Sequence, residues 1–114
     1  MLLTILGLVI PGVLYSAAAL EITTALKQIN PDQTEFVVAA KKALFRRNYE
    51  ISVKGPNRIV GEYKRGLIME IILTDTAVTV RNTDPGRNYK TDTVKKYLRN
   101  LHRDMVYEFA KYLL

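Results

Sequence analysis

The chain has 114 residues, of which 48% are hydrophobic and 25% charged, a composition that fits one folded domain and excludes bulk disorder. Its 17 lysines and arginines outnumber the 11 acids, and the net charge of +6 suits anionic partners such as nucleic acid, acidic lipid headgroups or acidic polymers. The absence of cysteine excludes disulfides, thiolate metal sites and thiol nucleophiles.

The first 20 residues carry no charged side chain. An apolar run over 2–10 precedes the helix-breaking pair Pro11-Gly12 and the small residues of 16–19, an order that resembles a secretory signal peptide cleaved near Leu20. We therefore expect residues 1–19 to be a signal peptide, although the usual basic residue near the start is absent, and we expect a periplasmic or secreted protein. A retained membrane anchor facing outside the cytoplasm is the competing interpretation, because twenty uncharged residues can span a bilayer. A buried N-terminal element of the domain is the third.

Residues 20–30 are predicted to be a linker or a short helical arm, and residues 31–114 a single domain. A first helix is expected over 31–47, because Asn30 suits the N-cap and proline suits the first helical position. Apolar side chains then recur at helical spacing, at Phe36, Val37, Ala40 and Leu44.

From residue 49 the apolar period changes to two, which predicts strands. Turn sequences separate four of them, at 49–54, 58–64, 67–73 and 77–81, and the short gaps favour antiparallel hairpins. A polar loop over 82–92 leads to a final helix that Asp92 or Thr93 can cap. The predicted fold class is α+β, a two-layer sandwich in the order helix, four-stranded antiparallel meander, helix.

The residues that usually carry chemistry do not form a recognisable catalytic, metal or cofactor site. His102 is the sole histidine and lacks a second ligand or a nucleophile, so we expect it to lie on the surface of the last helix. Glu70 is expected to point outward from a half-buried strand. Asp104 and Glu108 are expected to form solvated ion pairs with neighbouring cations. No glycine-rich phosphate-binding motif is present, so we expect no enzyme.

The remaining candidate is a basic strip at the start of the last helix. Its residues are Arg87 and Lys90 in the preceding loop and Lys95, Lys96, Arg99 and Arg103 on the helix. Lys95, Arg99 and Arg103 are four residues apart and share one helix side, which could contact anionic headgroups or a polyanion. A solvated basic surface without a dedicated partner is the alternative. Nearby Tyr97 and Tyr112 are interpreted as residues at the edge of the core.

Several short motifs point to a family. They are the stretch Gly55–Glu62 with the two residues before it, Val-Lys-Gly-Pro-Asn-Arg-Ile-Val-Gly-Glu; the strand Ile68-Met69-Glu70-Ile71; the pair Asn88-Tyr89; and the helix segment 97–105 with Tyr97, Asn100 and Leu101. On these motifs, residues 36–109 resemble a family of small, uncharacterised bacterial envelope lipoproteins. The resemblance implies an α+β fold and an envelope location, and it implies no activity. The chain departs from the family because Ala17, and not a lipobox cysteine, follows Leu14-Tyr15-Ser16.

We therefore expect a non-enzymatic secreted or periplasmic accessory domain that binds an envelope protein, an anionic lipid or an anionic polymer. The alternative is a cytosolic domain that binds double-stranded RNA, because helix, antiparallel strands, helix is also the outline of that fold, and Lys95-Lys96 near a helix start could hold phosphates. The apolar leader and the expected fourth strand count against it.

Overall fold

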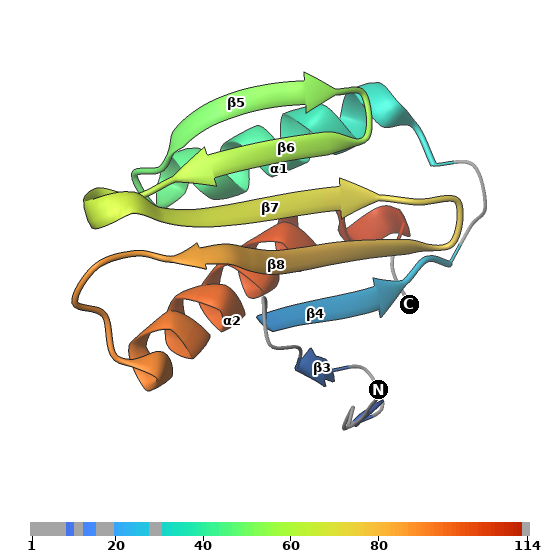
Figure 1. The fold of residues 1–114 in the computed structure, drawn as a ribbon. Helices are drawn as coiled ribbons and strands as arrows, with labels where there is room; N and C mark the ends of the chain where they lie inside the picture. Colours follow the sequence, from blue (N-terminus) through green and yellow to red (C-terminus); the bar gives the residue numbers. More distant parts are fainter. Residues whose placement is uncertain (1–8, 11–12, 16–19, 28–30, 113–114) are drawn as a thin grey trace.

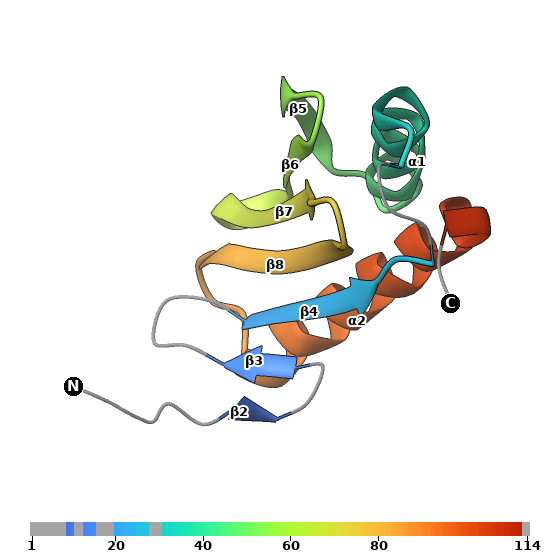
Figure 2. The ribbon, with the colours of Figure 1, turned by 90° about the vertical axis from the view of Figure 1, so that its right-hand side faces the viewer.

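The computed structural model describes residues 9–10, 13–15, 20–27 and 31–112. Two helices lie on one face of an antiparallel sheet whose strand order is β2-β3-β4-β8-β7-β6-β5 (Figures 1 and 2). The strands are β2 (Val9–Ile10), β3 (Val13–Tyr15), β4 (Leu20–Ala25), β5 (Glu50–Gly55), β6 (Arg58–Glu62), β7 (Leu67–Leu73) and β8 (Ala77–Pro85). The helices are α1 (Gln33–Arg46) and α2 (Thr91–Glu108), with short 3-10 turns η1 (Lys64–Gly66) and η2 (Ala110–Tyr112).

The α+β class and the β5–β8 meander are as predicted, but the expected count of four strands is wrong. Residues 20–25, expected to belong to a linker or helical arm, form strand β4, which pairs with β8 from Leu20↔Asn82 to Ala25↔Ala77. The β-branched run Ile22-Thr23-Thr24 suits an extended backbone, and Ile22 packs against the core. From β4 onward, the element order is therefore strand, helix, four strands, helix, and we call β4 to β8 the body of the sheet.

Part of the predicted leader also falls within the described residues. Strand β3 pairs with β4, and β2 pairs with β3, so these short strands extend the sheet beyond β4. The rest of residues 1–19 lies outside the described part of the chain, and the signal-peptide and anchor interpretations stay predictions. Across the described ranges, no helix is both long and apolar enough to cross a bilayer.

Helix α1 begins close to the predicted position, with a different cap. The Asp32 side chain accepts a hydrogen bond from the Glu35 backbone N–H at 3.0 Å, which makes Asp32 the N-cap; the expected cap, Asn30, lies outside the described residues. The buried side of α1 consists of Phe36, Ala39, Ala40, Ala43 and Leu44. A Cβ at Gly61 of β6 would lie 2.5 Å from a Leu44 methyl group, so this glycine lets α1 approach the sheet closely.

The sheet has a covered face and an open face. On β7, Met69, Ile71 and Leu73 are buried beneath the helices, while the residues between them point to the open face. Strand β8 continues to Pro85, beyond the predicted end at residue 81, because the buried Asn82 side chain donates hydrogen bonds to the carbonyls of Ile68 (2.9 Å) and Asp84 (2.7 Å).

Helix α2 starts slightly earlier than predicted. Lys90 is the N-cap, and its carbonyl accepts from the N–H groups of Thr93 and Val94, so the expected caps Asp92 and Thr93 already lie inside the helix. The apolar side of α2 is buried against the sheet and α1, through Val94, Leu98, Leu101 and Met105. This leaves the opposite side of α2 to the solvent.

Candidate functional site

The open face of the sheet carries charges that nearly cancel. Cross-strand register and the residues around a shallow hollow of about 380 Å³ place four carboxylates and three cations on it: Glu21, Glu50, Glu62 and Glu70 with Lys54, Arg58 and Arg81. This face is therefore close to neutral, and the net positive charge of the chain lies elsewhere.

Glu70 is the centre of the open face. It points away from the helices as expected, yet only 2% of its side chain is exposed, because arginines of two neighbouring strands lie over it. Arg81 Nε donates to one carboxylate oxygen at 2.6 Å, and Arg58 Nε donates to the other. Burial acts to raise the pKa of Glu70, but the two guanidinium groups together outweigh it and hold the pKa below its usual value. Glu70 is thus a structural ion-pair centre.

The outer side of α2 keeps three of the four predicted helix cations free of carboxylates. Lys96, Arg99 and Arg103 are exposed, and helical spacing places them opposite the buried stripe of α2. No salt bridge joins them to a carboxylate of the described residues. Lys95 differs, because it is half-buried and already takes part in an interaction.

The predicted loop residues Arg87 and Lys90 are exposed beside cations that the sequence did not single out. The Arg87 backbone N–H donates to the Arg65 carbonyl at 2.9 Å, and the Tyr89 hydroxyl donates to the Lys64 carbonyl at 2.9 Å. The Arg65 guanidinium lies 4.3 Å from the centre of the Tyr89 ring. The β8–α2 loop and η1 therefore form one unit, the basic loop end, with exposed Lys64, Arg65, Arg87 and Lys90.

Backbone geometry explains why these two connections fit together. Gly86 has φ +72, and a Cβ there would lie 2.9 Å from the Arg65 carbonyl oxygen and the Leu67 nitrogen. Arg65 itself has φ +59, in the left-handed region that few non-glycine residues occupy. Both positions are fixed by the contact between the loops, so the basic side chains project from a defined backbone.

A row of four tyrosines leads from the basic loop end into the helix layer. Ring centres are 5.8 Å apart for Tyr89–Tyr97, 5.8 Å for Tyr97–Tyr63 and 5.3 Å for Tyr63–Tyr49. Burial, followed by the neighbouring tyrosines, raises the pKa of the Tyr49 hydroxyl, which therefore stays neutral. The row braces the loops against α2.

A hollow of about 270 Å³ lies at the inner end of this row, lined by Arg46, Arg47, Asn48, Tyr49, Tyr63, Tyr97 and Asn100. Its cations are already paired: Arg47 binds Asp104 with two hydrogen bonds, at 2.6 and 3.2 Å, and Arg46 bonds Glu108. Asp104 is 6% exposed, so the expectation that it forms a solvated surface pair is wrong: it is buried between the helices, where Arg47 compensates its charge. A molecule bound in this hollow would therefore contact aromatic rings and neutral polar groups.

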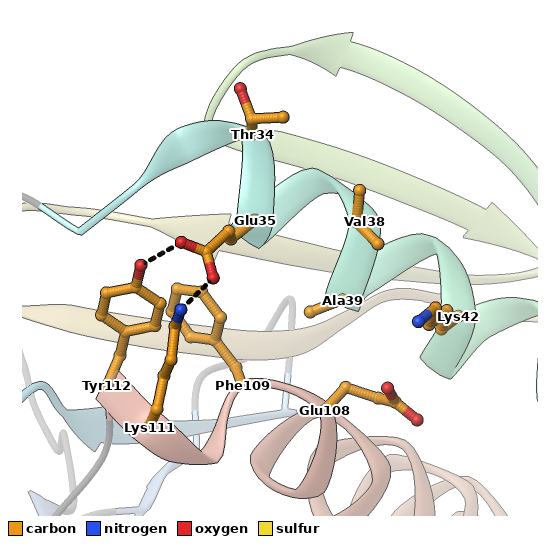
Figure 3. Close-up of a pocket in the computed structure, with 9 residues that line it drawn as sticks. All are labelled: Thr34, Glu35, Val38, Ala39, Lys42, Glu108, Phe109, Lys111 and Tyr112. Carbon is orange, nitrogen blue, oxygen red and sulfur yellow. Dashed lines mark hydrogen bonds and ion pairs between the residues drawn. The ribbon is translucent and has the colours of Figure 1, made fainter.

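A second hollow, of about 310 Å³, lies between α1 and the end of α2 (Figure 3). Glu35 reaches across from α1 to accept hydrogen bonds from Lys111 and from the Tyr112 hydroxyl, the latter at 2.6 Å. The Lys111 bond and then the Tyr112 bond lower the pKa of Glu35. Lys42 and Lys111 face Glu35 and Glu108 around this hollow, so its charges also balance.

The predicted surface position of His102 is also wrong. His102 is half-buried, and its Nε2 lies 2.6 Å from the Thr24 hydroxyl of β4, so the side chain joins α2 to the strand that the sequence missed. Burial lowers the pKa of His102 and favours the neutral ring. Among the described residues no cluster of three or more histidines and acids could hold a metal ion.

Comparisons of the chain with protein families, with curated proteins and with solved structures find no match.

Proposed function

We propose that the protein is a non-enzymatic binding domain that contacts an anionic component of the cell envelope through two surfaces. They are the solvent-facing surface of α1 and α2, called the helix side, and the basic loop end. One observation carries the proposal. Exposed cations gather on these surfaces without carboxylate partners in the described chain, whereas the arginines on the open face of the sheet and those between the helices are paired with carboxylates. On α2 and at the basic loop end, the exposed cations that form no salt bridge with a described residue are Lys64, Arg65, Arg87, Lys90, Lys96, Arg99 and Arg103. Such an arrangement raises the local concentration of anions and supplies contacts to them.

The envelope part of the proposal depends on the leader. Cleavage after Ala19 would leave a mature chain that starts with Leu20, the first residue of β4. That chain would lose β2 and β3 but retain every residue that pairs with β8, so export and cleavage are compatible with strands β4 to β8 of the sheet. Mass measurement of the protein from fractionated cells tests this step: a periplasmic species that starts at Leu20 is expected, and an intact chain in the cytosol would contradict it.

Binding of the full chain to linear polyphosphate, titrated with salt, tests the anion site. We expect affinity to fall steeply with salt, and Lys96→Glu with Arg103→Glu to weaken binding on the order of 100-fold. The matched control is Lys27→Glu with Lys54→Glu, which changes the net charge equally at exposed positions outside the proposed surface, and we expect it to change affinity less than about threefold. Equal losses in both variants would show that only the net charge matters.

Double-stranded RNA remains the second candidate, because both helices lie on one face of an antiparallel sheet with lysines near the start of the second helix. The strands that precede α1 and the resulting width of the sheet depart from that outline. An RNA duplex of about 16 base pairs should bind no more tightly than polyphosphate of equal charge if the first proposal holds. Strong preference for the duplex would favour the RNA function.

A further inference from the structure

The helix side exposes large apolar side chains as well as cations. The large hydrophobic residues exposed in the described chain are Phe45 (77%), Tyr107 (73%), Val53 (51%) and Val38 (46%). Val38 and Phe45 are two helical turns apart on the solvent side of α1, and Tyr107 is on α2, so three of them lie in the helix layer.

Cations surround this apolar line. Lys41 and Lys42 are exposed on α1 within one turn of Phe45. Arg46 contacts Tyr107, with its guanidinium carbon 5.7 Å from the ring centre, which joins the outer sides of the two helices. On α2, Arg103 lies one turn before Tyr107. The same surface thus combines a highly exposed phenyl ring, a tyrosine and several lysines and arginines.

A bilayer with anionic lipids matches this combination. A phenyl ring can enter the boundary between headgroups and acyl chains, a tyrosine is favourable at that depth, and lysines attract the anionic headgroups. The two hollows next to this surface have balanced charges, so neither favours an isolated anion over an extended anionic surface. We propose that the helix side docks on an anionic lipid bilayer, with Phe45 inserted and Lys41 and Lys42 against headgroup phosphates. This inference rests on the proposed function and names its partner.

The absence of tryptophan from the chain gives a direct test. Phe45→Trp places a single fluorescent reporter at the proposed insertion point, and Val53→Trp places one at the apolar position on β5 that is 51% exposed. The probes are vesicles of phosphatidylglycerol and phosphatidylcholine in equal parts, and vesicles of phosphatidylcholine alone. We expect the emission of Phe45→Trp to shift to shorter wavelength on the anionic vesicles only, and that of Val53→Trp to stay unchanged.

Partition measurements sharpen the result. Phe45→Ser should reduce partition into the anionic vesicles by about tenfold or more, since an inserted phenyl ring contributes on that scale, while Val53→Ser should leave it unchanged. Lys41→Glu with Lys42→Glu should also reduce partition. All four substituted positions are exposed, so the thermal unfolding temperature of each variant should match that of the parent chain.

Four outcomes would overturn the inference. Vesicle binding without a shift at Phe45→Trp would assign the binding to another segment, such as the apolar leader. A solution dimer that Phe45→Ser dissociates would make a second copy the occupant. Binding to polyphosphate without binding to vesicles would leave the proposed function standing and remove only the bilayer. Failure to bind either probe would remove both.

Discussion

The open face of the sheet and the helix side use the same kinds of cation in different ways. On the open face, Arg58 and Arg81 are held by Glu70, which they cover almost completely. On the helix side, Lys96 and Arg103 project into solvent without a carboxylate in the described residues. The arginines of the open face stabilise the fold through ion pairs, whereas the cations of the helix side are available to bind an anion. The count of lysines and arginines in the sequence therefore overstates what can bind an anion.

The largest effect should follow from breaking the open-face ion pairs. Glu70→Gln removes a nearly buried charge between two arginines, and we expect the free energy of unfolding to fall by about 2 kcal/mol. Denaturant titration measures it. Glu62→Gln, an exposed acid on the same face, should change stability by less than about 0.5 kcal/mol. A similar value for both variants would mean that the open face gains nothing specific from its central carboxylate.

The second largest effect should be the pH dependence of the stability difference between the parent chain and Glu70→Gln. Because the folded-state pKa of Glu70 lies below its ordinary value of 4.5, its stabilising contribution is present above pH 4.5 and is lost as the pH falls through the folded-state pKa. The stability gap between the parent chain and Glu70→Gln should be constant near neutral pH and should close in acid. A gap that widens in acid would contradict the lowered pKa.

The smallest stability effect is expected on the helix side. Lys96→Ala and Arg103→Ala remove exposed cations that make no ion pair with the described residues, so each should change the free energy of unfolding by less than about 0.5 kcal/mol. The same variants should weaken polyphosphate binding. A substantial loss of stability in either one would show that these cations serve the fold, as the arginines of the open face do.

Much of the fold could be predicted from local patterns. The apolar spacing in α1 and α2 and the alternation in β5 to β8 reflect burial against one core, so they are visible in the sequence. Strand β4 could not be predicted in this way. Apolar and polar residues alternate only from Leu20 to Thr23, too short a run to identify a strand. The strand forms by pairing with a distant partner: Thr23 and Thr79 are 56 residues apart. The long-range pairing overrides the weak local signal.

The candidate site was predictable only in part. Lys96, Arg99 and Arg103 follow from helical spacing, because the position of a residue on an isolated helix is a local property. Lys64 lies at the end of a predicted strand and Arg65 in the turn that follows it, and their place beside Arg87 depends on the contact between two loops. The Lys-Arg-Gly sequence of that turn was the one signal available. The burial of Asp104 depends on Arg47, from a helix 57 residues earlier, and had no local signal.

Strand β4 also bears on the sequence in which the molecule assembles. The meander β5 to β8 and its hairpins join neighbours along the chain, so they can form as soon as they are made. Strand β4 is made before the meander but has no partner among β5 to β8 until β8 exists, and closing so long a loop is slow in comparison with a hairpin. Its contact from Thr24 to His102 needs a residue 78 positions later. Strand β4 is therefore expected to be among the last to dock, and a nascent or translocating chain would keep it unpaired with β8 until synthesis is nearly complete.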